Sequence, residues 1–138
     1  MLVPLLNPLE VITERTIPRF GPPVRLSLQG RGLRDMVPWE EGFLVLAGDY
    51  HAEADALPQR LYWWAGPGSD PEPCLLDFGD CNPEALIVHG DSGSARLQIL
   101  SDDGNRQIGG EKACKKLASS PEKQRFRSYW LEDWAKPL

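Results

Sequence analysis

Prolines and glycines are spread along the whole chain, and they constrain its fold more than any other feature. The sequence holds 13 of each among 138 residues. Proline breaks the interior of a helix and glycine weakens it, so long helices are disfavoured over most of the chain. Short strands joined by turns suit this punctuation, and the sequence therefore predicts an all-β fold with little helix.

Eight short segments are expected to form these strands. A continuous apolar run between two glycines, residues 42–48, predicts a strand that is buried on both faces. The other segments alternate in polarity or are rich in aromatic and β-branched residues. The expected strands cover residues 24–28, 33–37, 42–48, 60–66, 74–78, 84–90, 95–101 and 125–131. A helix is favoured at residues 111–118 alone, where it would be short and mostly exposed.

Size and charge narrow the classes of protein to which the chain can belong. Its 138 residues are expected to form a single domain. A net charge of −5 gives no overall basic surface of the kind that nucleic-acid binding needs, so we expect no nucleic-acid partner. The last third is locally basic, and this segment is interpreted as a solvated surface. Its basic residues are Lys112, Lys115, Lys116, Lys123, Arg125 and Arg127.

The sequence also favours a cytoplasmic chain without a membrane partner. No apolar run is as long as a transmembrane helix, and the apolar start lacks the basic region and cleavage site of a signal peptide. The three cysteines, Cys74, Cys81 and Cys114, are odd in number and lack CxxC spacing. We therefore expect reduced thiols, with one disulfide plus one free thiol as the alternative.

A weak internal repeat relates two parts of the chain. When Phe43 is placed on Leu97, EGFLVLAGD at positions 41–49 lies over ARLQILSDD at positions 95–103. The other matched pairs are Val45 with Ile99, Leu46 with Leu100 and Asp49 with Asp103; the same shift places Leu33 on Ile87. A spacing of about 50 residues with about four strands per unit is typical of β-propeller blades.

Five segments carry a family resemblance when they are taken in order. They are GRGLRDM at 30–36, FLVLAG at 43–48, LYWWAG at 61–66, NPEAL at 82–86 and LSDDG at 100–104. Together they resemble the C-terminal part of an uncharacterised, mostly bacterial domain-of-unknown-function family that is regarded as a β-propeller. The blade pattern is also similar, more distantly, to the esterase-like domain of phytase-like proteins.

This resemblance covers residues 22–131 and implies antiparallel four-stranded blades. The first blade-like unit would span about residues 22–80 and the second residues 81–131, within one domain of residues 1–138. Members of the family are longer, so the resemblance implies an incomplete β-propeller of about two blades, with open sheet edges and an uncovered blade face. It therefore implies a fragment, a shortened gene product or a chain completed by another chain, and we expect a homo-oligomer or a companion chain that supplies the missing blades.

Charged residues at strand ends form the candidate site. Arg34 and Asp35 interrupt an otherwise apolar strand, which is unusual. We hypothesise that four side chains meet at one axial opening, namely Arg34, Asp35, Glu84 and Asp102, and that Arg34 and Asp103 line the channel there. The alternatives are an ion pair for the charged residues within the strand and a turn cap for Asp102.

The same opening is the predicted metal site. Ca²⁺ and Mg²⁺ prefer oxygen ligands, and Ca²⁺ is the cofactor that the resemblance suggests. The predicted ligands are Asp35, Asn82, Glu84 and Asp102. The alternative is that these residues end strands and cap turns without binding a metal ion.

Other reactive or aromatic residues are interpreted as structural. His89 is expected to be partly buried with its hydrogen bonds satisfied, and Ser92 to lie in a turn, because the nucleophile pattern around it is incomplete. His51 is expected in a solvated loop, with a metal site formed together with Asp49, Glu53 and Asp55 as the alternative. The tryptophans are expected to pack in the core and between blades; they are Trp39, Trp63, Trp64, Trp130 and Trp134.

Two functions follow from these observations. The first is a binding or scaffold module that assembles with itself or with a chain carrying the missing blades. The second is a fragment of a divalent-metal-assisted ester or phosphoester hydrolase, as the phytase-like resemblance implies, in which the bound ion would polarise the substrate or activate water. Fold alone does not decide between them.

Overall fold

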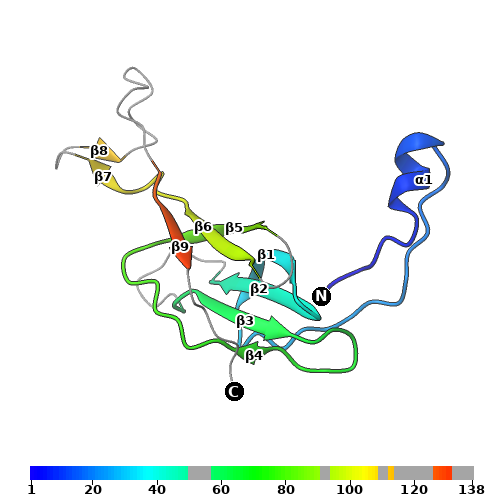
Figure 1. The fold of residues 1–138 in the computed structure, drawn as a ribbon, viewed down its shortest axis with the longest axis horizontal. Helices are drawn as coiled ribbons and strands as arrows, with labels where there is room; N and C mark the ends of the chain where they lie inside the picture. Colours follow the sequence, from blue (N-terminus) through cyan, green and yellow to red (C-terminus); the bar gives the residue numbers. More distant parts are fainter. Residues whose placement is uncertain (50–56, 91–93, 109–111, 114–125, 132–138) are drawn as a thin grey trace.

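The computed structural model describes residues 1–49, 57–90, 94–108, 112–113 and 126–131 (Figure 1). Its regular structure is almost entirely antiparallel β, which confirms the predicted all-β class. No helix in these ranges is long and apolar enough to cross a membrane. The elements are α1 (Pro8–Thr13), β1 (Gly32–Trp39), β2 (Gly42–Gly48), β3 (Arg60–Trp64), β4 (Glu72–Pro73), β5 (Pro83–His89), β6 (Arg96–Ser101), β7 (Gln107–Ile108), β8 (Lys112–Ala113) and β9 (Ser128–Leu131).

The first sheet is a meander of four strands in the order β1-β2-β3-β4. Its central strand β2 is buried along nearly all of its length, as the continuous apolar sequence predicts. β1 joins β2 through a two-residue turn, in which Glu40 adopts a left-handed φ of 51°. Gly42 follows this turn because a Cβ there would lie 2.5 Å from the Trp64 carbonyl oxygen.

The second sheet has three strands in the order β5-β6-β9. β5 and β6 form a hairpin, and β9 pairs with the other edge of β6 from the distant end of the chain. β7 and β8 form a separate two-stranded ribbon. β5 also lies against β1 of the first sheet, so the first strands of the two sheets are neighbours.

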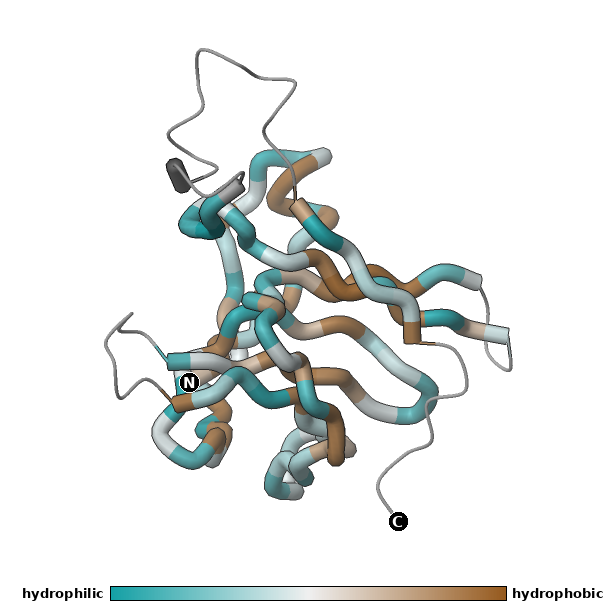
Figure 2. The backbone as a smooth tube through the Cα atoms, turned by 90° about the vertical axis from the view of Figure 1, so that its left-hand side faces the viewer, coloured by the Kyte–Doolittle hydropathy of each residue, from teal (hydrophilic) through white to brown (hydrophobic). Residues whose placement is uncertain are grey.

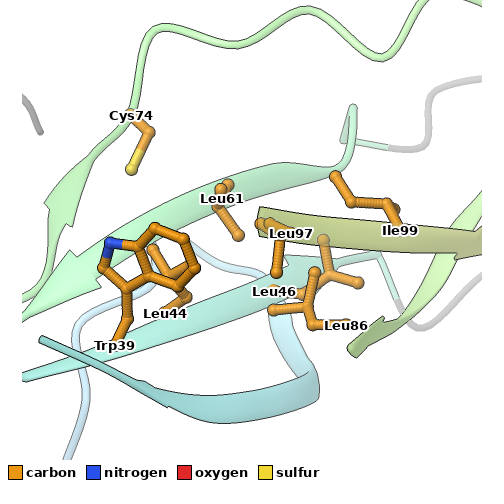
Figure 3. Close-up of a cluster of buried hydrophobic side chains, with 8 residues drawn as sticks. All are labelled: Trp39, Leu44, Leu46, Leu61, Cys74, Leu86, Leu97 and Ile99. Carbon is orange, nitrogen blue, oxygen red and sulfur yellow. The ribbon is translucent and has the colours of Figure 1, made fainter. Parts of the chain in front are cut away.

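The hydrophobic core lies between the two sheets. Its eight side chains come from both sheets and from the segment after β4, and Figure 3 shows them converging: Trp39, Leu44, Leu46, Leu61, Cys74, Leu86, Leu97 and Ile99. In Figure 2 the apolar stretches run along the strands in the middle of the molecule. Burial of this apolar surface is the main force that holds the sheets together.

A second apolar cluster covers the other face of the first sheet. Val45, Ala47, Tyr62 and Trp64 point away from the second sheet and pack against Leu28. The N-terminal segment adds partly buried side chains, Leu2, Val24 and Leu26, to this cluster. Both faces of the first sheet are therefore covered, one by the second sheet and one by the N-terminal segment.

Some expected elements differ from those observed. Residues 24–28 do not form a strand, because they cross the face of the first sheet and make one isolated bridge, from Val24 to Leu2. Residues 74–78 are not a strand either: β4 lies just before them, and Asp77 accepts a hydrogen bond from the Gly79 amide in a tight turn. At 112–113 the expected helix is replaced by β8, and residues 114–118 lie outside the described ranges. The helix α1 was not predicted.

The two sheets repeat one three-stranded unit, with β1-β2-β3 as the first unit and β5-β6-β9 as the second. The strand registers show which residues correspond. Val45 pairs with Tyr62 in the first unit, and Ile99, its counterpart in the repeat, pairs with Tyr129 in the second. In the same way Leu44 pairs with Trp63, and Gln98 pairs with Trp130. The third strands thus carry a common Arg-x-Tyr-Trp sequence, at residues 60–63 and 127–130.

Both units also contain a bulge at the same place in their first strand. The register shifts between Leu33 and Asp35 in β1, and between Pro83 and Ala85 in β5. The bulged residues, Arg34 and Glu84, are therefore equivalent. This alignment of the first strands corrects the predicted match of Leu33 with Ile87, which is wrong because the two first hairpins differ in loop length.

Candidate functional site

A cleft of about 480 Å³ lies where the two bulges meet. Four of the predicted site residues line it: Arg34, Asn82, Glu84 and Asp102. The other lining residues are Asp49, Leu57, Pro58, Gln59, Asp77, Phe78, Gly79, Cys81 and Asn105. Asp35 and Asp103 lie outside this lining.

The two bulged residues pair with each other across the sheets. Arg34 Nη1 lies 3.0 Å from Glu84 Oε1, and each side chain is about one-third exposed. Arg34 also donates a hydrogen bond to the Asp49 carbonyl oxygen. A bulge turns its extra residue out of the strand ladder, which is why these two side chains can meet beside the core. Arg34 therefore pairs with Glu84 of the second unit, and not with its neighbour Asp35.

Asp35 joins the two first strands by hydrogen bonds to the backbone. Its Oδ2 accepts a hydrogen bond from the Leu86 amide of β5 at 2.7 Å, and its Oδ1 accepts one from the Met36 amide at 2.8 Å. Both carboxylate oxygens thus have backbone partners. This residue links the sheets and contributes no lining atom to the cleft.

Asn82 and Asp102 both line the cleft and are held by hydrogen bonds to each other. The Asp102 amide donates to the Asn82 carbonyl oxygen at 2.8 Å, and Asn82 Nδ2 donates to the Asp102 carbonyl oxygen at 3.2 Å. Asp102 Oδ1 accepts a hydrogen bond from the Gly104 amide at 2.8 Å, so Asp102 caps its own turn. The Asn82 amide oxygen also accepts a hydrogen bond from Gln59.

Asp103 is buried and anchors the start of β9. Its carboxylate accepts hydrogen bonds from the Arg127 amide, from the Arg127 guanidinium and from the Ser101 hydroxyl, each at 2.9 Å. The bonds from Arg127 lower the pKa of Asp103 to about 2. The same guanidinium pairs with the exposed Asp80 at 2.8 Å and lowers its pKa as well.

No three Asp, Glu, His or Cys side chains within the described ranges converge as ligands for one metal ion. In the cleft, the Glu84 carboxylate is paired with Arg34, and Asp102 uses one oxygen in its turn. Cys81 is a free thiol in the cleft wall, and Cys74 is a free thiol in the core. Burial raises the pKa of Cys74 to about 12, so this thiol stays protonated and unreactive at neutral pH.

A second candidate surface lies on the far side of the second sheet and is called the outer face here. Strand alternation and register assign to it Ala85, Ile87, His89, Arg96, Gln98, Leu100, Ser128 and Trp130. Trp130 is 43% exposed and Ile87 37%. His89 and Arg96 both lie against the Trp130 ring, with 4.8 Å between the two ring centroids and 4.9 Å from the guanidinium carbon to the ring centroid.

The outer face corrects two expectations from the sequence. His89 is exposed, because it stands on the outer face, where it interacts with Gln98 and Trp130. Trp130 was expected to pack in the core or between blades, but it lies on a strand face that points away from the core. The Arg-x-Tyr-Trp repeat was the signal that could have drawn attention to Trp130. His51, Ser92, Cys114 and Trp134 lie outside the described residues.

The other tryptophans follow the prediction more closely. Trp39 and Trp64 are buried, and Trp63 packs against the core between the sheets.

Comparison of the chain with protein-family models, with curated proteins and with solved structures found no match. The propeller resemblance therefore rests on the five segments quoted for it.

Proposed function

We propose that this protein is a self-assembling scaffold module, and that a second copy of the chain covers the outer face of its second unit. The observation that carries this proposal is the pair of equivalent tryptophans. Trp63 packs against the core between the sheets, whereas Trp130 is 43% exposed at the same position of the repeated unit. The second unit thus exposes on its outer face the surface that the first unit buries between the sheets.

The chemistry of the outer face suits a protein interface. Ile87, Leu100 and Trp130 form its apolar part, and His89 and Arg96 stand beside the indole. Tryptophan and arginine are enriched among the residues that dominate binding energy at interfaces. Stacking of a histidine and a guanidinium on the Trp130 ring restricts the side chain before binding, which lowers the entropy cost of association.

A second copy is the occupant that completes the molecule. Both faces of the first sheet are covered, and the inner face of the second sheet packs on the first sheet. Within the described residues, each chain therefore keeps one sheet face with its aromatic side chain exposed. A symmetric pair uses the same patch on both subunits, so a dimer satisfies both outer faces and remains closed.

We further propose that the two units are blades of an incomplete β-propeller, as the family resemblance implies. Three observations support this interpretation: both units are antiparallel with the second strand in the centre, both carry a bulge in the first strand, and β1 and β5 lie side by side. A cytoplasmic setting belongs to the same proposal. The free thiols of Cys74 and Cys81 suit a reducing compartment.

Light scattering after size-exclusion chromatography tests the proposed self-assembly. At about 100 µM, where micromolar association is complete, we expect the native chain to have twice the mass of the single chain, 15.4 kDa. Trp130→Glu should be monomeric, because it places a charge in the interface. Leu75→Glu, at a fully exposed position away from the outer face, is the matched control and should remain dimeric. A monomeric native chain, or a Trp130→Glu variant that still dimerises, contradicts the proposal.

A metal-assisted hydrolase remains the second candidate function, and the cleft is the observation that favours it. Asn82, Glu84 and Asp102 line one cavity, and their oxygens are of the type that Ca²⁺ prefers. A bound ion would stabilise the fold by mass action. We expect millimolar Ca²⁺ to leave the melting temperature unchanged. A rise that is lost in Glu84→Gln would instead support the metal site.

A further inference from the structure

The N-terminal arm, defined as residues 3–20, projects away from the two sheets (Figure 1). The helix α1 forms part of the arm and has no buried residue. The arm's large apolar side chains are 40% to 85% exposed: Val3, Leu5, Leu6, Leu9, Ile12, Ile17 and Phe20. A concentration of exposed apolar side chains of this kind marks an interaction surface.

Hydrogen bonds hold this arm in one shape. The Asn7 side chain is buried just before α1, where its amide nitrogen donates to the Ile17 carbonyl oxygen and its amide oxygen accepts from the Arg19 backbone at 2.7 Å. Leu5 and Phe20 form an antiparallel bridge between the two sides of the arm. Its apolar side chains are thus presented in a preorganised arrangement, which favours binding because little ordering remains.

The arm leaves the first sheet from the face that points away from the second sheet. The segments that flank the arm, at Leu2 and Val24, pack on the first sheet on the side that faces away from the second sheet. The outer face is the opposite surface of the second sheet. The arm is therefore positioned to reach the outer face of another chain, and not its own.

We propose that the arm of a second copy is the segment that occupies the outer face, so that two chains exchange arms in a symmetric dimer. This inference rests on the proposed self-assembly and names the contact that would produce it. The N-terminal segment already covers one sheet face of this repeat, through Leu2, Val24 and Leu28 against Val45 and Tyr62. The arm continues directly from that contact.

Exchange also explains why one chain carries two exposed apolar surfaces. A stable interface buries about 800 Å² on each partner, and a two-fold axis makes every arm-to-face contact occur twice. Each subunit then contributes its arm and its outer face to one interface. Leu9 and Ile12 of the arm would meet Ile87 and Trp130 of the partner copy.

Mixing two full-length variants tests this exchange. The arm variant Leu9→Asp/Ile12→Asp changes two exposed side chains of α1, and the face variant is Trp130→Glu. Each variant alone should be monomeric in sedimentation velocity. An equimolar mixture should form a heterodimer, because the intact arm of the face variant can bind the intact face of the arm variant. Its dissociation constant should be roughly a hundredfold higher than that of the native dimer, since one of two linked contacts is left.

Glu14→Gln, which removes a charge from the arm without adding one to its apolar residues, is the control and should dimerise like the native chain. Near-ultraviolet circular dichroism verifies that every variant is folded.

If the arm variant dimerises normally while the face variant does not, the outer face is an interface but the arm does not occupy it, and this inference alone fails. A monomeric native chain overturns both proposals. If the arm variant loses binding to anionic phospholipid vesicles while its mass in solution equals that of the native chain, the arm binds a membrane surface instead.

Discussion

The two units of this protein have the same strand order, the same bulge and the same Arg-x-Tyr-Trp sequence, yet their third strands meet different surroundings. Trp63 packs between the sheets, whereas its equivalent Trp130 is 43% exposed. The local sequence sets strand pairing and register in both units. Burial depends on what packs against each sheet face. The second sheet covers one face of the first sheet, whereas within the described residues the outer face of the second sheet has no such covering layer.

The equivalent arginines differ in the same way. Arg60 donates to the Gln29 side chain at 2.9 Å, near the segment that covers the first sheet. Arg127 instead binds the buried Asp103 and the exposed Asp80. β3 follows β2 in the chain, but β9 returns from a distant part of the sequence. The second unit therefore depends on an ion pair to anchor its third strand, and the comparison can be tested at several positions.

The largest expected difference lies between two equivalent leucines, Leu46 and Leu100. Leu46 is fully buried between the sheets, and Leu46→Ala should lower the free energy of unfolding by about 3 kcal/mol. Leu100 is only partly buried on the outer face, so Leu100→Ala should cost about 1 kcal/mol or less. Urea denaturation in the monomeric Trp130→Glu background measures both changes without a contribution from self-association. Equal losses would mean that the outer face is buried within the chain.

Removing the anchor of β9 should have an effect of similar size. Asp103→Ala deletes a buried carboxylate with several hydrogen bonds and should lower the free energy of unfolding by about 3 kcal/mol. Asp80→Ala removes the other, exposed partner of Arg127 and should change the stability little. Denaturation of the two variants side by side makes the comparison. If Asp80→Ala is the more damaging, Asp103 does not carry the anchor.

The same carboxylate predicts a pH dependence that the first unit does not share. The pKa of Asp103 is about 2 in the folded state and about 3.9 in an unfolded chain. The native state therefore gains roughly 2 to 3 kcal/mol from this group above pH 4 to 5, and it loses this contribution as the pH falls towards 2. The difference in stability between the native chain and Asp103→Asn should shrink over that interval. A difference that stays constant between pH 5 and pH 2 would contradict the assignment.

The smallest effect is expected where the two units meet, at the pair of bulged residues. Arg34 and Glu84 are each about one-third exposed, so solvent screens their attraction. A double-mutant cycle with Arg34→Met and Glu84→Gln should give a coupling energy of about 0.5 kcal/mol. A coupling that remains unchanged in high salt would indicate a more buried pair than the structure shows.

Much of the fold could be predicted from the sequence because its signals are local. The apolar run between Gly42 and Gly48 gave a buried strand with the expected bounds. The hairpin of β5 and β6 was also located to within a residue. The strand predicted at residues 24–28 was wrong because alternating polarity is typical of any segment that packs one side on an apolar surface. Such a segment can cross a sheet face instead of joining the sheet edge.

From the sequence, the candidate site could be predicted as a set of polar residues at one opening, but not the partners of those residues. The sequence singled out Asn82, Glu84 and Asp102, and the structure places all three on one cleft. It could not show that Glu84 pairs with Arg34, since that contact joins two bulges that lie far apart along the chain. Neither could it show that Asp103 is turned into the protein while its neighbour Asp102 caps a turn.

The sequence by itself determined the β class, the strands of both central hairpins and the repeat between them, because alternation, glycine and proline act within a few residues. The tertiary structure decided which face of each strand is buried, which charges are paired, and that the arm and the outer face are left exposed. Those properties depend on which surfaces meet in space. Two copies of one sequence pattern can therefore fold alike and still present opposite faces, one to the core and one to solvent.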